Sequence, residues 1–299
     1  MTRPGWSGIF PSLATPFLSD GELDLDGQRS IVRFALEAGS HGLLCFGLAG
    51  EVFRLTPAER IELLLTIVDE CDHRVPILAG VGTEAEHTSI RLAQETAAAG
   101  ASGVVIPPPL TAPASEAELL RYFEAIADTV GVPVVIQDAP EYLKVEVGPR
   151  LVERLAERIP NFVGLKLEVG ADALVPWVDA FAERLTIFCG NGGLYMLDCL
   201  RHGAAGIAPG VDLVDVLVEI YELWQADQEQ AAWERMRQAL PMVAFQMRDI
   251  DHYNATAKYV LRKRGVLSCD ELRAPAYRLD APARRILDDY LEQLNLVPA

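Results

Sequence analysis

Lysine is scarce in this chain: of 26 basic residues only four are lysines, at positions 144, 166, 258 and 263. Positive charge is scarce as a whole, because 43 acidic residues leave a net charge of −17. Binding to a phosphate backbone needs a basic surface, so this balance argues against nucleic acid as a partner. A small anionic substrate stays open, because a few backbone N–H groups can bind a carboxylate locally.

Cysteine motifs, histidine motifs and long apolar runs are also lacking. The five cysteines are scattered without a C-x-x-C pair, so neither a zinc site nor a disulfide framework is indicated. The five histidines form no H-E-x-x-H pattern, which disfavours a metal-dependent aldolase, and we expect no metal and no other cofactor. No apolar run is long enough to cross a membrane, and residues 1–6 lack the apolar region of a secretion signal. The expected location is therefore the cytoplasm.

Short β-rich runs alternate with longer amphipathic segments up to about residue 212. Two of these segments begin with a capping box, at Thr56–Glu59 and at Ser115–Glu118, which predicts helix starts there. The strands that we predict are Ile9–Ala14, Gly42–Phe46, Pro76–Ala79, Gly103–Ile106, Pro133–Gln137, Phe162–Glu168, Leu185–Cys189 and Gly206–Ala208.

A strand followed by a helix, repeated in this way, predicts the α/β class and a (β/α)8 TIM barrel. The competing fold is a doubly wound sheet, which usually carries a glycine fingerprint after its first strand; Ala14–Phe17 has none. We expect residues 1–212 to form the barrel. Residues 213–299 show helical patterns and no strand signal, so we expect a C-terminal helical extension packed on the barrel.

Lys166 stands inside one of the predicted strands, in the apolar run Asn161-Phe-Val-Gly-Leu-Lys-Leu-Glu-Val169. A charged amine is costly to bury, and a buried amine can lose its proton and act as a nucleophile on a carbonyl. Side chains alternate along a strand, so Lys166 and Glu168 are expected on one face. Two roles for Glu168 stay open: a proton shuttle during imine formation, or a structural ion pair that keeps the lysine protonated.

Unusual residues gather where the predicted strands end, and barrel active sites lie at the C-terminal ends of strands. Gly47–Glu51 is glycine-rich and can direct backbone N–H groups at an anion. Gln137 can hydrogen-bond a substrate oxygen, while Asp138 after it has the alternative of bonding its own loop. We predict catalytic roles for Lys166, Gln137 and Glu168, and substrate contacts for Thr15, Leu48, Ala49, Gly50, Gly190, Asn191 and Ile207.

Several motifs in order resemble the dihydrodipicolinate synthase and N-acetylneuraminate lyase family over almost the whole chain. Gly8–Phe17 is similar to the family's first strand, and Gly47-Leu-Ala-Gly-Glu51 stands where the family has G-T-T-G-E. Pro140 stands where the family has the proline of Y-N-V-P. Gly164-Leu-Lys-Leu-Glu168 stands where it has G-I-K-E/D. The resemblance implies a class I aldolase-type barrel in which Lys166 forms a Schiff base, assembled as a homotetramer of two tight dimers.

The chain departs from the family at residues that carry hydroxyl groups there. Leu48 and Ala49 replace the two threonines, Gln137 replaces the tyrosine of Y-N-V-P, and Pro108 and Pro109 replace a tyrosine pair. Dihydrodipicolinate synthase activity is therefore in doubt. Ile136-Gln-Asp-Ala-Pro140, Leu165–Glu168 and the segment 254–266 resemble a subgroup of 2-keto-3-deoxy-pentonate dehydratases of the L-arabonate type.

Three hypotheses for the function remain. The first is a Schiff-base dehydratase of a 2-keto-3-deoxy sugar acid. The second keeps the Schiff base but performs aldol cleavage that releases pyruvate, or a synthase-like condensation. The third, motivated by the lost hydroxyls, is a catalytically weak barrel that binds keto acids. In each case the expected partner is a small 2-keto acid, with no nucleic acid and no membrane.

Overall fold

In the computed structural model, the residues described are 4–109, 114–143 and 145–297. The strands are β1 (Gly8–Ile9), β2 (Leu43–Cys45), β3 (Ile77–Gly80), β4 (Gly103–Ile106), β5 (Val134–Asp138), β6 (Phe162–Leu167), β7 (Thr186–Cys189) and β8 (Gly206–Ile207). They pair in parallel in the order β1-β8-β7-β6-β5-β4-β3-β2, which confirms the predicted parallel α/β sheet.

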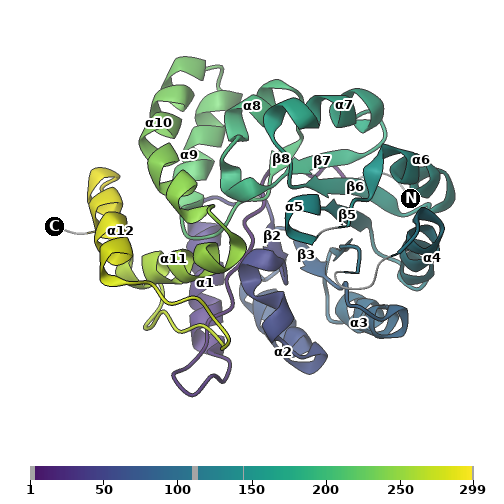
Figure 1. Ribbon diagram of the computed structural model, residues 1–299, viewed down its shortest axis with the longest axis horizontal. Coiled ribbons are helices and arrows are strands. Elements are labelled where there is room, and N and C mark those ends of the chain that lie inside the picture. The colour runs from purple at the N-terminus through teal and green to yellow at the C-terminus, as the bar shows by residue number, and fades with distance from the viewer. Residues whose placement is uncertain (1–3, 110–113, 144, 298–299) are drawn as a thin grey trace.

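The sheet curls until its two ends meet, as in a (β/α)8 barrel (Figure 1). Ser12 joins the two ends of the sheet, because it forms parallel β-bridges with Leu44 of β2 and with Gly210, which follows β8. The first strand is shorter than the predicted Ile9–Ala14, because Pro11 lacks an N–H group and interrupts the ladder. Its carbonyl still accepts from the N–H of Leu44, so the chain continues along β2 without regular strand geometry.

Helices surround the sheet, and the predicted capping boxes are both present. Their bounds are α1 (Leu25–Glu37), α2 (Pro57–Cys71), α3 (Glu86–Ala98), α4 (Glu116–Ala127), α5 (Pro140–Leu143), α6 (Gly148–Arg158), α7 (Ala171–Phe181), α8 (Met196–Arg201), α9 (Val214–Gln225), α10 (Glu229–Gln246), α11 (Ile250–Lys263) and α12 (Ala281–Gln293). Short 3₁₀ turns follow two of the strands: η1 (Leu48–Gly50) and η2 (Val52–Arg54) after β2, and η3 (Asn191–Gly193) after β7.

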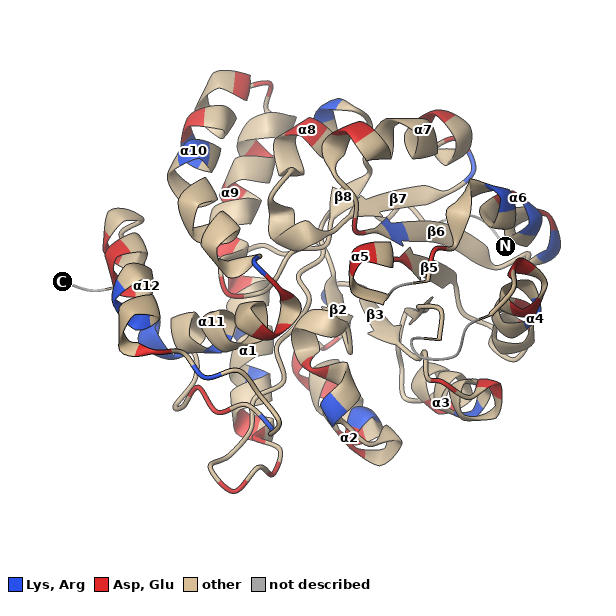
Figure 2. Ribbon diagram, viewed as in Figure 1, with Lys and Arg blue, Asp and Glu red and all other residues tan. Residues whose placement is uncertain are grey.

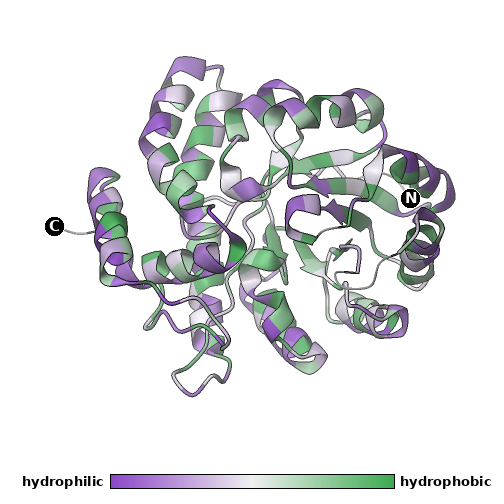
Figure 3. Ribbon diagram, in the orientation of Figure 1, coloured by the Kyte–Doolittle hydropathy of each residue, from purple (hydrophilic) through white to green (hydrophobic). Residues whose placement is uncertain are grey.

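The core divides into two layers because side chains alternate across a strand. One layer fills the barrel interior and includes Phe10, Val135, Val163 and Phe188. The other lies between the strands and the helices, and Figure 3 shows the strands predominantly apolar while the helices carry both apolar and polar residues. Charged residues gather on helices and loops (Figure 2). Lys166 is the one lysine or arginine in the sequence of β6.

In the described part of the chain after β8, the regular elements are the helices α9 to α12, with a non-helical segment at 264–280 between α11 and α12. Helix α9 packs against β1 and against α10, so it covers the sheet although the predicted boundary at residue 212 assigns it to the extension. That division into barrel and extension stays a prediction. Helix α11 packs against η1, which brings the C-terminal segment to the strand ends where the unusual residues gather. Within the described ranges, no helix combines the length and apolar character needed to cross a membrane.

Candidate active site

Lys166 lies on β6 directly beside Gln137 of β5, its partner in the strand register. Its side chain is buried, with 5% of the residue exposed, and its Nζ donates to Oε1 of Glu168, which is 7% exposed. The prediction that Lys166 and Glu168 share a face is confirmed. A buried ammonium and a buried carboxylate each need a partner to offset the loss of water, and here each supplies the other.

Glu168 is fixed in place by the turn after β7. Its Oε2 accepts a hydrogen bond from the backbone N–H of Asn191, whose φ of 51° lies in the left-handed region. A Cβ atom at Gly190 would overlap the Glu168 carboxylate, so only glycine leaves room for it. Gly190 and Asn191, both predicted as substrate contacts, therefore act on Glu168 and lie outside the linings of the two cavities at this end of the barrel.

A small cavity of about 40 Å³ lies at Lys166 and Glu168. Among the predicted residues, Leu48 and Ala49 also line it. Ile207 does not, because its side chain packs in the layer between strands and helices, and the next residue, Ala208, faces inward and lines the cavity instead. Adjacent residues of a strand point to opposite faces of the sheet. A prediction that is off by one residue therefore names a core residue in place of the one that lines the cavity.

Two tyrosines that the sequence did not single out line the same cavity, Tyr142 of α5 and Tyr253 of α11. The hydroxyl of Tyr253 donates to Oδ1 of Asp212 at 2.6 Å, a buried bond that commits its proton. The hydroxyl of Tyr142 donates to Oδ1 of Asn191 at the longer distance of 3.3 Å. Burial first, and the charge of Glu168 second, raise the pKa of Tyr142, so it keeps its proton at neutral pH.

The turn η1 shapes the other side of the cavity. Thr15 lies outside both cavity linings, and its Oγ1 donates to the carbonyl of Gly50 at 2.7 Å, so this predicted substrate residue supports the turn. The N–H of Gly50 donates to the carbonyl of Gly47 at 3.0 Å. The N–H groups of Leu48 and Ala49 come first in the turn, where helical geometry supplies no acceptor. The N–H of Gly50 is therefore used within the turn, whereas those of Leu48 and Ala49 are left for an anion of the kind expected at Gly47–Glu51.

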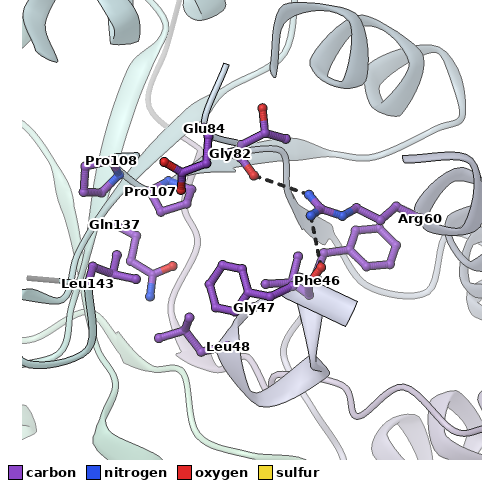
Figure 4. A pocket seen from close by; sticks show the side chains of 13 residues that line it. Phe46, Gly47, Leu48, Arg60, Gly82, Glu84, Pro107, Pro108, Gln137 and Leu143 are labelled. Carbon is purple, nitrogen blue, oxygen red and sulfur yellow. Dashed lines mark hydrogen bonds between the residues drawn. The ribbon is translucent and has the colours of Figure 1, made fainter. Parts of the chain in front are cut away.

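Figure 4 shows the lining of a larger cavity of about 200 Å³. Leu48 lines both this cavity and the first one. Gln137, for which a catalytic role is predicted, lines this cavity and is 4% exposed, and its Nε2 has no hydrogen-bond partner within the described part of the chain. An unsatisfied buried amide is costly, so this group is suited to receive a substrate oxygen. Asp138 accepts a hydrogen bond from the N–H of Val147 at 3.1 Å. It therefore bonds its own loop, which is one of the roles expected for it.

A further buried lysine, Lys258 of α11, supports the site from outside the cavities. Its Nζ lies 2.5 Å from Oε1 of Glu51 and 4.3 Å from the centre of the Phe17 ring. Asn254, one turn earlier, donates to the carbonyl of Leu48 at 3.2 Å. These contacts tie the turn after β2 to a helix some 200 residues later. The sequence of segment 254–266 does not predict this structural role, because its partners are far away in the chain.

Comparison with known proteins gives a family model, described as the dihydrodipicolinate synthetase family, that matches residues 5–294. YagE of Escherichia coli (strain K12), provisionally named a 2-dehydro-3-deoxy-D-gluconate aldolase, is 31% identical over 97% of this chain and 98% of its own length. A 4-hydroxy-tetrahydrodipicolinate synthase of Stenotrophomonas maltophilia (strain R551-3) is 39% identical over 62% of this chain and 63% of its own.

Among solved structures, YagE in complex with pyruvate superposes with a TM-score of 0.91 at 29% identity, over 97% of this chain and 99% of that one. The similarity extends over nearly the full length of both chains, so it includes the strand ends and the turns described above as well as the barrel.

Proposed function

Since the chain belongs to the dihydrodipicolinate synthetase family, we propose that it is a Schiff-base-forming lyase that acts on a 2-keto acid through Lys166. The observation that supports this most directly is the buried Lys166 amine, which lines a cavity together with its partner Glu168. A lysine whose role was only structural would gain nothing from facing a cavity. Lys258, equally buried, is held by Glu51 and by the carbonyl of Glu271 outside both cavity linings.

Imine formation begins when Lys166 transfers a proton to Glu168 and the free amine adds to C2 of the keto acid. The former carbonyl oxygen takes this proton back from Glu168 and leaves as water, so that a positively charged iminium and an ionised Glu168 remain. This charge forms beside the Glu168 carboxylate, which stabilises it in a site of low dielectric. The N–H groups of Leu48 and Ala49 are placed to bind the C1 carboxylate, so the substrate extends from there towards Gln137.

Dehydration follows if the substrate carries a hydroxyl at C4. The iminium draws electrons from C3, Glu168 accepts the C3 proton, and an enamine forms. Its electrons then expel the C4 hydroxyl, which leaves as water with a proton from Tyr142, while the Gln137 amide binds the departing oxygen. Water releases the unsaturated 2-keto acid and restores Lys166, and the proton on Glu168 returns to Tyr142 through solvent.

Replacing Glu168 tests its role as the base. In Glu168→Gln the amide cannot take up a proton, so kcat is expected to fall by about 10²–10⁴-fold. Borohydride trapping of pyruvate on Lys166 is expected to continue, more slowly. Glu141→Gln serves as the matched control, because Glu141 is an exposed acid on the neighbouring α5. Unchanged turnover in Glu168→Gln would leave Glu168 with the structural role alone.

Replacing Tyr142 tests the proton donor. In Tyr142→Phe the ring remains but the hydroxyl is gone, so the dehydration rate is expected to fall by about 10²-fold or more. Exchange of the C3 protons of pyruvate with deuterium needs only Lys166 and a base, and it should persist. Tyr195→Phe is the matched control, since Tyr195 lies outside both cavity linings. Equal losses of exchange and dehydration in Tyr142→Phe would contradict the assignment.

Aldol cleavage is the second candidate, and the name of YagE together with its pyruvate complex favours it. It uses the same imine but breaks the C3–C4 bond, with the C4 hydroxyl giving up its proton. A sugar acid is the first substrate to test, because both the resemblance and the name of YagE include one. Pyruvate among the products would establish cleavage over dehydration, while a synthase-like condensation would consume pyruvate.

The deciding experiment is borohydride reduction in the presence of pyruvate and of 2-keto-3-deoxy acids, followed by peptide mass mapping. A ligand-dependent adduct on Lys166 is the expected result. Binding of keto acids without an adduct would favour a catalytically weak binding barrel instead. We also propose, from the family, a homotetramer built of two dimers and a cytoplasmic location. Light scattering tests the first, since a mass of one chain would contradict it, and cell fractionation tests the second.

A further inference from the structure

We propose that the larger cavity holds an apolar group at C4 of the substrate, so that the preferred substrate is a 4-hydroxy-2-keto acid with an alkyl or aryl substituent. This proposal rests on the Schiff-base function of Lys166. With C2 on Lys166 and the carboxylate at Leu48 and Ala49, the chain beyond C4 passes Gln137, which is adjacent to Lys166 in the register. Gln137 and Leu48 both line the larger cavity, so the tail enters it there.

The walls of the larger cavity are mostly apolar. They come from three separate segments: the turns after β2, the end of β4, and α5. The apolar side chains beyond Leu48 are those of Phe46, Val52, Phe53, Pro107, Pro108 and Leu143. Val52 and Leu143 are buried, whereas Phe53 is 59% exposed. A large exposed ring at the edge of a cavity loses contact with water when an apolar group packs on it, and this favours binding.

Beyond Gln137, which is assigned to the C4 oxygen, the polar groups of the wall offer few partners to sugar hydroxyls. The guanidinium of Arg60 donates to the carbonyls of Val52 at 3.0 Å and Gly82 at 3.4 Å, as Figure 4 shows. The hydroxyl of Thr83 donates to the carbonyl of Ala85 at 3.0 Å. Glu84 is exposed to solvent, so it lies at the rim. A polyhydroxylated chain entering this space would lose more water contacts than Gln137 and the exposed Glu84 can replace, which costs affinity.

The departures from the family fall on the same walls. Leu48 stands where the family has a threonine, and Pro108 replaces one of its tyrosines, so two hydroxyls are replaced by apolar groups. The volume is also suitable: an apolar cavity of about 150 Å³ accommodates benzene, and this one measures about 200 Å³. The lost hydroxyls are thus explained by an apolar substrate, without a loss of activity.

The test compares two 4-hydroxy-2-keto acids, 4-hydroxy-2-oxo-4-phenylbutanoate and a 2-keto-3-deoxy-pentonate. Dehydration of the phenyl compound loses the C3 proton and the C4 hydroxyl as water and yields a conjugated acid that absorbs in the ultraviolet, and cleavage yields pyruvate and benzaldehyde. We expect kcat/KM for the phenyl compound to be at least about 100-fold higher, because single methylenes in apolar pockets contribute about 10–200-fold. A preference for the pentonate would overturn the proposal.

Phe53→Ser provides the matching variant, and Leu65→Ser is its control, because Leu65 is similarly exposed (53%) and lies outside the cavity lining. Phe53→Ser should lower kcat/KM for the phenyl compound by about 10-fold and leave the pentonate unaffected. An equal loss for both substrates would overturn the proposal and indicate that Phe53 contacts a second copy. Trapping of pyruvate tests the Schiff base separately, because pyruvate has no group that reaches the larger cavity. If pyruvate is trapped on Lys166 but the phenyl compound is not preferred, only the proposed substrate class is refuted. If no pyruvate adduct forms, the Schiff-base function is refuted as well.

Discussion

Lys166→Ala is expected to lower kcat/KM by about 10⁴-fold or more, because it removes the nucleophile on which every later step depends. The pyruvate adduct should disappear with it, as measured by intact mass after borohydride reduction. The substitution also leaves the buried Glu168 carboxylate without its cation, so part of the loss could come from local rearrangement.

Lys166→Arg separates these two effects. A guanidinium keeps the positive charge beside Glu168 but stays protonated and does not form an imine. Turnover should be as low as in the alanine variant, while the melting temperature should stay closer to that of the wild type. Lys263→Ala is the control for lysine loss elsewhere, since Lys263 lies on α11 with a partly exposed side chain. Measurable trapping at another lysine in Lys166→Ala would contradict the assignment of the nucleophile.

Lys258→Met is expected to lower the free energy of unfolding by about 3–5 kcal/mol, the usual effect of removing one partner from a buried ion pair. Burial lowers the pKa of Lys258 and Glu51 raises it, so the ammonium depends on this carboxylate. Once Lys258 is gone, the ion-pair partner left to Glu51 among the described residues is Arg54, at the longer distance of 3.4 Å. Thermal and urea unfolding followed by circular dichroism measure the change.

Two further variants test whether the loss of stability comes from the unpaired buried charge of Glu51. Lys263→Met removes a lysine from the same helix, but its pair with Asp288 is partly exposed and should contribute at most about 1 kcal/mol. Glu51→Gln combined with Lys258→Met removes both charges and should recover part of the lost stability. If Lys263→Met lowers the free energy of unfolding as much as Lys258→Met does, the loss does not depend on burial of the ion pair, and the prediction is wrong.

The sequence by itself determined the features that depend on local periodicity. Alternation along β6 was sufficient to place Lys166 and Glu168 on one face, and the Thr56 and Ser115 capping boxes were sufficient to place two helix starts. The order of strands and helices predicted the parallel α/β sheet. These features follow from residues within a few positions of one another, where backbone geometry leaves few alternatives.

The tertiary structure decided what depends on contacts between distant segments. It placed Ala208 instead of Ile207 at the cavity, because the exact strand register sets which residue faces inward. It assigned Thr15 to the support of a turn, brought Tyr142 to the lysine cavity, and paired Lys258 with Glu51. Such contacts arise only when strands and helices pack together, and packing depends on the whole chain at once, so no local pattern specifies them.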